Sequence, residues 1–136
     1  MQPRLVLPLP RSVNSLVTYS PSGSLVKRHD VVRWSRDAML LARVWRRTAQ
    51  WVPTVREKVI VRLWTYWPDG TYRDTHNLYK VLFDALQGVL YDNDYWVLPR
   101  QQDFIVDRNH PRLELTLSRF SEEVLTHDTT LSDVES

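Results

Sequence analysis

The chain has 136 residues, 43% of them hydrophobic, and no cysteine. This length suits one domain with a single core, and the lack of cysteine excludes a disulfide framework, a thiolate zinc site and a cysteine nucleophile. The net charge is only +2, yet residues 1–58 hold eleven Lys and Arg against three Asp and Glu. Such clustering indicates a polyanionic partner or merely a solvated basic helix face, and charge alone does not choose between them.

The N-terminal segment is interrupted by prolines. Pro3, Pro8 and Pro10 break its apolar patch, and no long apolar run follows. We therefore expect a short strand and then a loop, with neither a signal peptide nor a membrane span, in a soluble cytoplasmic protein. Pro21 and Gly23 predict that the next loop is a turn or a flap.

Residues 29–50 carry the spacing of an amphipathic helix. Apolar residues recur at intervals of three and four, which predicts one buried stripe with arginines on the remaining surface. The residues of the predicted stripe are Val31, Trp34, Ala38, Leu41 and Trp45.

Residues 58–67 alternate strong β-formers and predict a strand, which Pro68, Asp69 and Gly70 end in a turn. A second helix is predicted over residues 75–87, with Gly88 as its C-terminal cap. Its predicted buried stripe is Leu78, Val81, Leu82, Ala85 and Leu86.

Two further alternating segments, residues 101–108 and 112–120, predict a terminal hairpin. The order of elements predicts an α+β fold in which a small mixed β-sheet packs against helices on one face. We expect residues 1–120 to form the domain. Residues 121–136, with five acids and no Lys or Arg, form an acidic C-terminal tail.

Polar residues bracket the second predicted helix. Asp74 and His76 are two residues apart, so in extended chain both side chains point to one side, and Lys80 follows one helical turn later. Asp92 and Asp94 come after a short segment that could return the chain beside Asp74. Such a group suits metal-assisted attack on a phosphodiester, but helix capping and turn formation also explain these residues, and their spacing alone does not favour the metal site.

Other chemistries find less support. The chain has no G-x-S-x-G elbow, and its three glycines cannot form a phosphate-cradling glycine-rich loop.

The segment "RDTHNLYKVLFDALQGVLYDNDYW", residues 73–96, resembles the RusA-like family of Holliday junction resolvases. The family pattern is approximately R-D-x-D-N-x-x-K-x-x-x-D-A-L followed by an acidic pair before a strand. The positions that match in place are Arg73, Asp74, Asn77, Lys80, Asp84, Ala85 and Leu86. The opening "LPLPRSVNSLVTY" and the closing "RLELTLSRF" extend the resemblance over nearly all of residues 4–120.

The resemblance implies a homodimeric, magnesium-dependent endonuclease that binds branched DNA and nicks two strands symmetrically in recombination and repair. By motif position, Asp74 and Asp94 correspond to metal-binding carboxylates and Lys80 to the essential lysine, with Asp92 as a substitute ligand. His76 departs from the family, which has a second Asp there, and imidazole offers one neutral nitrogen instead of two charged oxygens. Three outcomes stay open: manganese bound by His76, charge supplied by Asp92, or junction binding without cleavage.

Under the same resemblance, basic residues acquire a role on the DNA backbone. The residues expected to contact DNA are Asn14, Lys27, Arg28, Arg33, Arg36, Arg43, Arg46, Arg47 and Arg73. A structural or partner-binding protein is the remaining alternative, and it predicts binding that does not weaken with added salt.

Overall fold

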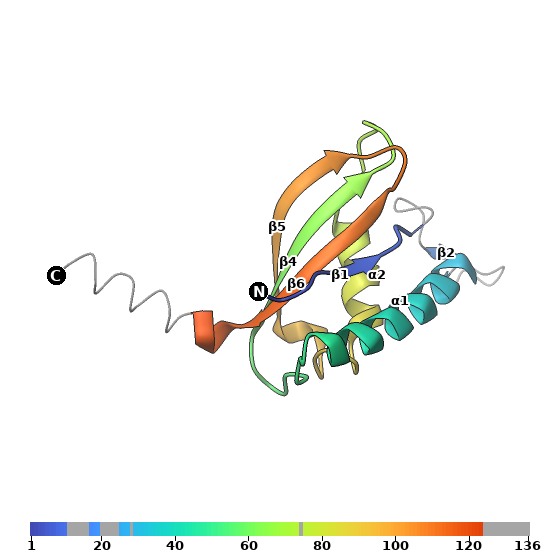
Figure 1. Cartoon of the computed structure of the whole chain (residues 1–136). Coiled ribbons are helices and arrows are strands. Elements are labelled where there is room, and N and C mark those ends of the chain that lie inside the picture. The colour runs from blue at the N-terminus through green and yellow to red at the C-terminus, as the bar shows by residue number, and fades with distance from the viewer. Residues whose placement is uncertain (11–16, 20–24, 28, 74, 124–136) are drawn as a thin grey trace.

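A computed structural model describes residues 1–10, 17–19, 25–27, 29–73 and 75–123 (Figure 1). In chain order the elements are β1 (Leu5–Leu7), β2 (Val17–Tyr19), β3 (Leu25–Lys27), α1 (His29–Thr48), β4 (Val59–Trp67), α2 (Thr75–Leu86), the 3-10 helix η1 (Asp94–Trp96), β5 (Val97–Val106) and β6 (Arg112–Arg119).

The main sheet of the described chain is mixed and has the strand order β1-β6-β4-β5. β4 lies inside it, parallel to β5 and antiparallel to β6. Both helices share one hydrophobic core with the inward side chains of the sheet, including Leu63 and Leu115. The predicted α+β class, with helices on one face of a small mixed sheet, is confirmed.

The predicted hairpin between the last two strands is wrong. β5 and β6 lie on opposite sides of β4, and the chain between them passes the end of β4, where the Asp107 amide donates to the Trp67 carbonyl at 2.8 Å. Alternation and a short turn are the signature of a hairpin, but they do not specify the pairing partner. Six of the nine side chains of β4 are buried, and the strand is paired along both of its edges, with β5 on one side and β6 on the other.

Two strand predictions also change. The predicted flap contains an antiparallel pair, in which β2 and β3 align Val17 with Lys27 and Tyr19 with Leu25. β5 begins at Val97 rather than residue 101, and it includes Pro99. Proline argues against a central strand but is tolerated in an edge strand, where its missing N–H costs no ladder bond, and β5 is an edge strand.

Two tryptophans anchor α1 to the N-terminal segment. The indole of Trp34 donates to the Pro8 carbonyl at 2.7 Å, and that of Trp45 to the Pro3 carbonyl at 2.8 Å. The predicted buried stripe holds except at Leu41, which is 42% exposed, while Ala42 is fully buried. Both residues fit a spacing of three or four from Ala38, but they lie about 100° apart around the helix, so only one side of the stripe can face the core.

A polar network fastens α2 to the sheet. The Tyr79 hydroxyl donates to Gln101 at 2.6 Å, and the Gln101 amide donates to the Thr65 hydroxyl at 2.9 Å. Gln101 stands at the register shift between β4 and β5. The predicted stripe of α2 is buried except Val81, which is partly buried, and Phe83 is buried in addition.

The outer face of the sheet carries aromatic rings covered by arginines. The Arg4 guanidinium lies 3.6 Å from the Trp64 ring centroid, and that of Arg112 lies 3.7 Å from the Tyr66 centroid. Trp67 points inward and belongs to the core. The tryptophans and tyrosine of β4 therefore divide between the two faces.

The first residues of the predicted acidic tail continue the fold. Residues 120–123 form a helical turn after β6, and Glu123 pairs with Arg62 on the outer face of the sheet at 2.7 Å. None of the helices in the described part of the chain is both long and apolar enough to span a bilayer.

Gly88, the predicted cap, has a φ of 85° just after α2 ends at Leu86. A methyl group there would meet no atom within 4 Å, so any effect of Gly88→Ala comes from the backbone. We expect this change to lower the free energy of unfolding by about 1 kcal/mol, because L-residues disfavour the left-handed region. Gly70→Ala is the matched control, since its surroundings are equally open. Equal effects of the two changes in urea denaturation would contradict this explanation.

Candidate functional site

The approach to α2 is fixed at the carboxyl end of β4. The Arg73 guanidinium pairs with the Asp69 carboxylate at 2.9 Å and lies 5.0 Å from the ring centroid of Trp67, the last residue of β4. Asp74, between Arg73 and Thr75, lies outside the described residues. Arg73 itself lies at the carboxyl end of β4, beside Trp67.

A pocket of about 300 Å³ marks the same place. Its lining joins the approach to α2 with the far part of β5, and it consists of Trp67, Tyr72, Arg73, Thr75 and Phe104. The start of α2 therefore lies beside the carboxyl ends of both parallel strands.

His76 and Lys80 occupy the first two turns of α2, and both side chains are exposed. Lys80 has no ion-pair or hydrogen-bond partner in the described part of the chain. A solvated ammonium with no partner is available to an anionic ligand.

Asp94 lies at the other end of α2. Its backbone amide donates to the side chain of Gln87, the residue after the helix, at 2.8 Å. The nearby Tyr91 hydroxyl donates to the Phe83 carbonyl at 2.6 Å. Burial raises the pKa of Tyr91 well above its ordinary value, and the negative charges of Asp94 and Asp84 raise it further. Asp94 itself is exposed.

Asp92 has a structural contact. One of its carboxylate oxygens accepts from the Arg56 amide at 3.1 Å, and its own amide donates to the Thr54 carbonyl at 3.0 Å. Asp92 thus ties the loop before β4 to the segment before β5. Its predicted role as a substitute metal ligand stays a prediction.

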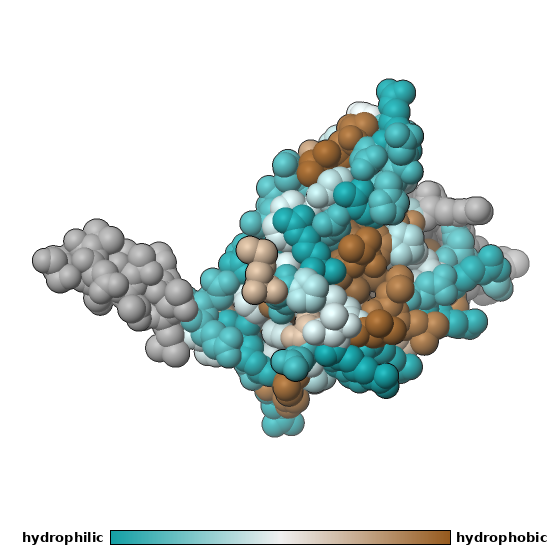
Figure 2. All heavy atoms as spheres, viewed as in Figure 1, coloured by the Kyte–Doolittle hydropathy of each residue, from teal (hydrophilic) through white to brown (hydrophobic). Residues whose placement is uncertain are grey.

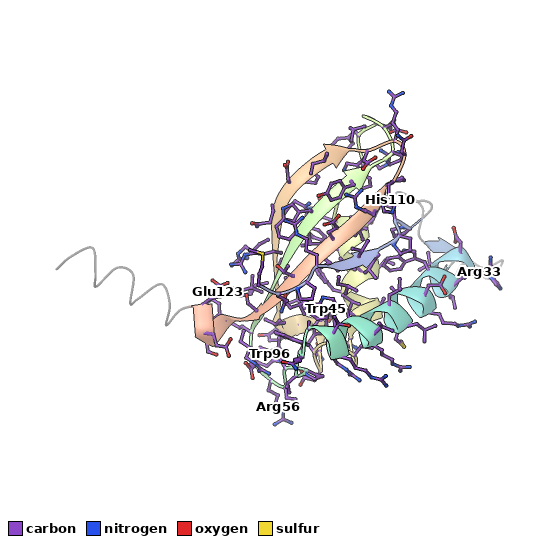
Figure 3. All side chains as sticks on the ribbon, viewed as in Figure 1. Arg33, Trp45, Arg56, Trp96, His110 and Glu123 are labelled. Atoms are coloured by element: carbon purple, nitrogen blue, oxygen red, sulfur yellow. The ribbon has the colours of Figure 1, made fainter. Side chains whose placement is uncertain are left out.

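The two halves of the predicted site are far apart within one chain. Because α2 has 12 residues, its ends are separated by about 18 Å. The register of β5 gives a similar measure, since Phe104 beside the start of α2 is about 23 Å along the strand from Val97, which follows η1. Figure 3 shows this separation, with Trp96 of η1 at one end of the sheet and His110, beyond the end of β5, at the other.

Among the described residues, no three His, Asp or Glu side chains lie close enough to hold one metal ion. Since the Asp94 amide is bonded to Gln87, just after α2, the segment after α2 does not return the chain to Thr75 at the start of the helix. The return predicted from the short length of this segment is therefore wrong. The predicted metal-binding roles of Asp74, His76 and Asp94 themselves stay predictions.

Comparison with known proteins gives one family. The family model described as Endodeoxyribonuclease RusA matches residues 10–118. The chain belongs to the RusA family. This family comprises Holliday junction resolvases, endodeoxyribonucleases that act on branched DNA in recombination and repair. No curated protein sequence matches the chain.

In this RusA-family chain, the arginines of α1 differ in how they are used. Arg46 donates to the Val89 carbonyl at 2.9 Å and so fastens α1 to the segment after α2. The other four predicted DNA contacts on α1 are exposed and have no ion-pair partner in the described residues. These are Arg33, Arg36, Arg43 and Arg47, and Figure 3 shows Arg33 pointing away from the helix.

The remaining predicted contacts divide similarly. Arg73 is engaged by Asp69 and Trp67, so DNA would compete with these partners for its guanidinium. Asn14 and Arg28 lie outside the described residues, and only the backbone of Lys27, in β3, is described.

Arg56 is a candidate that sequence reasoning missed. It is exposed, has no ion-pair partner in the described chain, and extends outward at the end of the molecule that carries Trp96 (Figure 3). Its φ is 51°, a left-handed conformation that is costly for a residue with a side chain. The Asp92 carboxylate holds its amide. A lone arginine in a loop carries no sequence signal for either property.

The Arg73–Asp69 pair makes a testable prediction. Hydrogen bonding from the Arg73 guanidinium holds the pKa of Asp69 far below its usual range, so the carboxylate stays charged until strongly acidic pH. We expect Arg73→Met to raise the pKa of Asp69 toward its ordinary value, measured by carboxyl NMR titration. Arg108→Met removes an exposed arginine elsewhere and serves as the control. An unchanged Asp69 titration in Arg73→Met would refute the assigned cause.

Proposed function

We propose that this chain is a metal-dependent endonuclease that resolves four-way DNA junctions as a homodimer. The family match over residues 10–118 carries the nuclease class. Lys80 on α2 and the exposed Arg33, Arg36, Arg43 and Arg47 on α1 have no ion-pair partner among the described residues, and this supports a phosphodiester substrate.

Lys80 is the charge-stabilising residue of this proposal. Attack on a phosphodiester places extra negative charge on the phosphoryl oxygens, and an ammonium that has no ion pair with the described residues can stabilise that charge without first breaking one of those contacts. The exposed position of Lys80 on the second turn of α2 lets a DNA strand approach it.

The donor types of the proposed site suit magnesium. Asp74 and Asp94 offer the carboxylate oxygens that magnesium prefers, and ligands of one ion lie within roughly 4 Å of each other. The residues beside Asp74 and those around Asp94 lie at opposite ends of α2. His76 would favour manganese more than the family's Asp does, because it contributes a neutral nitrogen.

Binding rests on the DNA backbone. The exposed arginines of α1 spread along a 20-residue helix of about 30 Å, a length that spans several phosphates. Contacts of this kind recognise junction shape and phosphate position rather than base sequence. Arg56 adds a cation at the end of the molecule that carries Asp94.

A second candidate is a junction-binding protein with impaired cleavage. The observation that favours it is His76, which removes a negative charge from the family's metal-binding pattern. This candidate shares all DNA contacts with the first and differs only in the chemical step.

The first prediction from the proposal concerns cleavage. We expect the protein to make paired symmetric nicks in a labelled four-way junction with magnesium or manganese, and Asp74→Asn to abolish them while junction binding persists. We expect His76→Asp to raise the rate with magnesium, since it restores a carboxylate.

The same experiment separates the two candidates. Binding without nicks in either metal, with nicks appearing only in His76→Asp, would identify the impaired junction binder. Binding that does not weaken between low and high salt would contradict both, because both depend on phosphate contacts.

The second prediction concerns Arg56. We expect the free energy of unfolding of Arg56→Gly to stay within about 1 kcal/mol of the wild-type value. Glycine adopts the left-handed φ without strain, which stabilises the folded state, but it also gives the unfolded chain more conformational freedom, and the two effects offset each other. Junction affinity should fall, with a plot of log affinity against log salt shallower by roughly one unit for one lost phosphate contact.

Gln50→Gly is the matched control. Gln50 has nearly the same φ, 54°, and is also exposed, but it carries no charge. Its replacement should change stability as Arg56→Gly does and leave affinity and salt dependence unaltered. Equal loss of affinity in both variants would assign the effect to the backbone and remove Arg56 from the DNA-binding residues.

A further inference from the structure

We infer that the distal part of the acidic tail docks on the second half of α1 and competes there with DNA. This distal tail is residues 124–136, which lie outside the described part of the chain. The docking surface, the α1 patch, consists of the exposed residues Leu40, Arg43, Val44 and Arg47. The contact itself does not depend on the proposed function, whereas its effect on DNA binding does.

The α1 patch combines positive charge with exposed apolar surface. Residues 39–48 hold three arginines and no acid. Leu40 is 53% exposed and Val44 is 66% exposed. Positions three and four apart are neighbours on a helix surface, so these two side chains and those of Arg43 and Arg47 form one continuous patch. Figure 2 shows hydrophobic and hydrophilic atoms next to each other over α1.

DNA phosphates account for only part of the α1 patch. Arg43 and Arg47 have no ion-pair partner among the described residues, which suits any anionic ligand. A phosphate, however, gives Leu40 and Val44 no apolar group to pack against. A single exposed apolar residue needs no explanation, but two neighbours on one helix face gain free energy when they are covered. The patch therefore fits a ligand with both carboxylates and apolar side chains.

The distal tail has this composition. It holds three acids and four large apolar residues, and it has no Lys or Arg. The acids are Asp128, Asp133 and Glu135, and the apolar residues are Val124, Leu125, Leu131 and Val134. Segments that only remain in solvent are typically poor in large apolar residues. The carboxylates of the distal tail complement the arginines of the patch, and its apolar side chains complement Leu40 and Val44.

Contacts among the described residues place the root of the tail beside the end of α1. Arg119, the last residue of β6, donates to the Val52 carbonyl at 2.9 Å, and its guanidinium lies 5.5 Å from the Trp51 ring centroid. The Trp51 amide in turn donates to the Arg46 carbonyl, in the last turn of α1, at 2.9 Å. The chain thus leaves β6 next to the end of α1 that carries the patch.

The distal tail is long enough to reach the patch. It follows Glu123, which in Figure 3 lies toward the Trp45 end of α1, with Arg33 marking the opposite end. Extended, residues 124–136 span up to about 44 Å. Residues 40–47 cover only about 11 Å of the helix axis, and a helix with its side chains is about 10–12 Å wide. The remaining length lets the chain pass around α1 to its exposed face.

Docking makes the distal tail a competitor of DNA. Its carboxylates would occupy Arg43 and Arg47, two of the residues expected to contact phosphate. Because the tail is tethered to the domain, its effective concentration is on the order of millimolar, so even a weak contact keeps the patch substantially covered. Any DNA that needs these two arginines must first displace the tail.

A double-mutant cycle on DNA affinity tests the contact. The neutral-tail variant is the full chain with Asp128→Asn, Asp133→Asn and Glu135→Gln, and the patch variant is the full chain with Leu40→Gln and Val44→Gln. We expect each to bind duplex DNA about threefold to tenfold more tightly than the wild type at low salt, because each removes the competitor. Combining the two sets of changes should bring no further gain, since there is only one contact to lose.

The patch variant separates docking from net charge. It leaves the charge of the chain unchanged, so its gain in affinity cannot come from weaker repulsion of DNA. Val6→Gln on β1, where Val6 is 45% exposed, is the matched control and should bind DNA as the wild type does. A gain in the neutral-tail variant alone would assign the effect to charge and rule out the α1 patch. No gain in either variant would rule out competition by the tail.

A measurement without DNA tests the same contact. The chain has no cysteine, so Ser132→Cys carries a nitroxide label at a single site in the distal tail. The label should broaden the amide NMR signals of residues 40–47 but not those of residues 100–106 in β5, and the neutral-tail changes should remove the effect. Absent or uniform broadening would overturn the inference. A protein that shows this contact but binds no DNA would instead count against the proposed function.

Discussion

The parallel pairing of β4 with β5 determines where His76, Lys80 and Asp94 lie. Parallel neighbours cannot be joined by a tight turn, so the chain must cross back over the sheet, and here α2 makes that crossing. A crossing helix begins at the carboxyl end of one strand and finishes near the amino end of the next. The residues that enter α2 and those that leave it are thereby held at opposite ends of the sheet, whatever their side chains.

The packing that holds this crossing in place is partly polar. Tyr79, Gln101 and Thr65 form a chain of hydrogen bonds from α2 through the edge strand to the central strand. Burial raises the pKa of the Tyr79 hydroxyl, so it remains a neutral donor at any physiological pH. Since directional bonds tolerate little sliding, they fix the position of α2 more narrowly than the surrounding leucines could. The same hydrogen bonds fix the position of the Lys80 backbone, because Lys80 directly follows Tyr79 in α2.

Sequence reasoning reached the elements but not their arrangement. Hydrophobic periodicity located α1, α2 and β4 within a few residues, because burial of one face is a local property of the chain. The pairing of β6 with β1 and β4 depends on which strands lie inside the sheet, and no local sequence pattern encodes that arrangement. The sequence did not predict that β5 begins before Pro99, because a proline fits a strand only at the edge of a sheet. Which strand lies at the edge is a property of the whole sheet.

The same limit applies to the candidate site. The sequence motif predicted correctly that His76 and Lys80 lie on one helix. It did not show that Asp94, which belongs to the same motif, lies at the other end of that helix. Asp92 and Asp94 have the same chemistry in the sequence, but the structure gives Asp92 a backbone partner at Arg56 and leaves Asp94 exposed beside Gln87. Among the arginines, Arg46 and Arg73 are engaged, whereas Arg43 and Arg47 have no partner in the described chain.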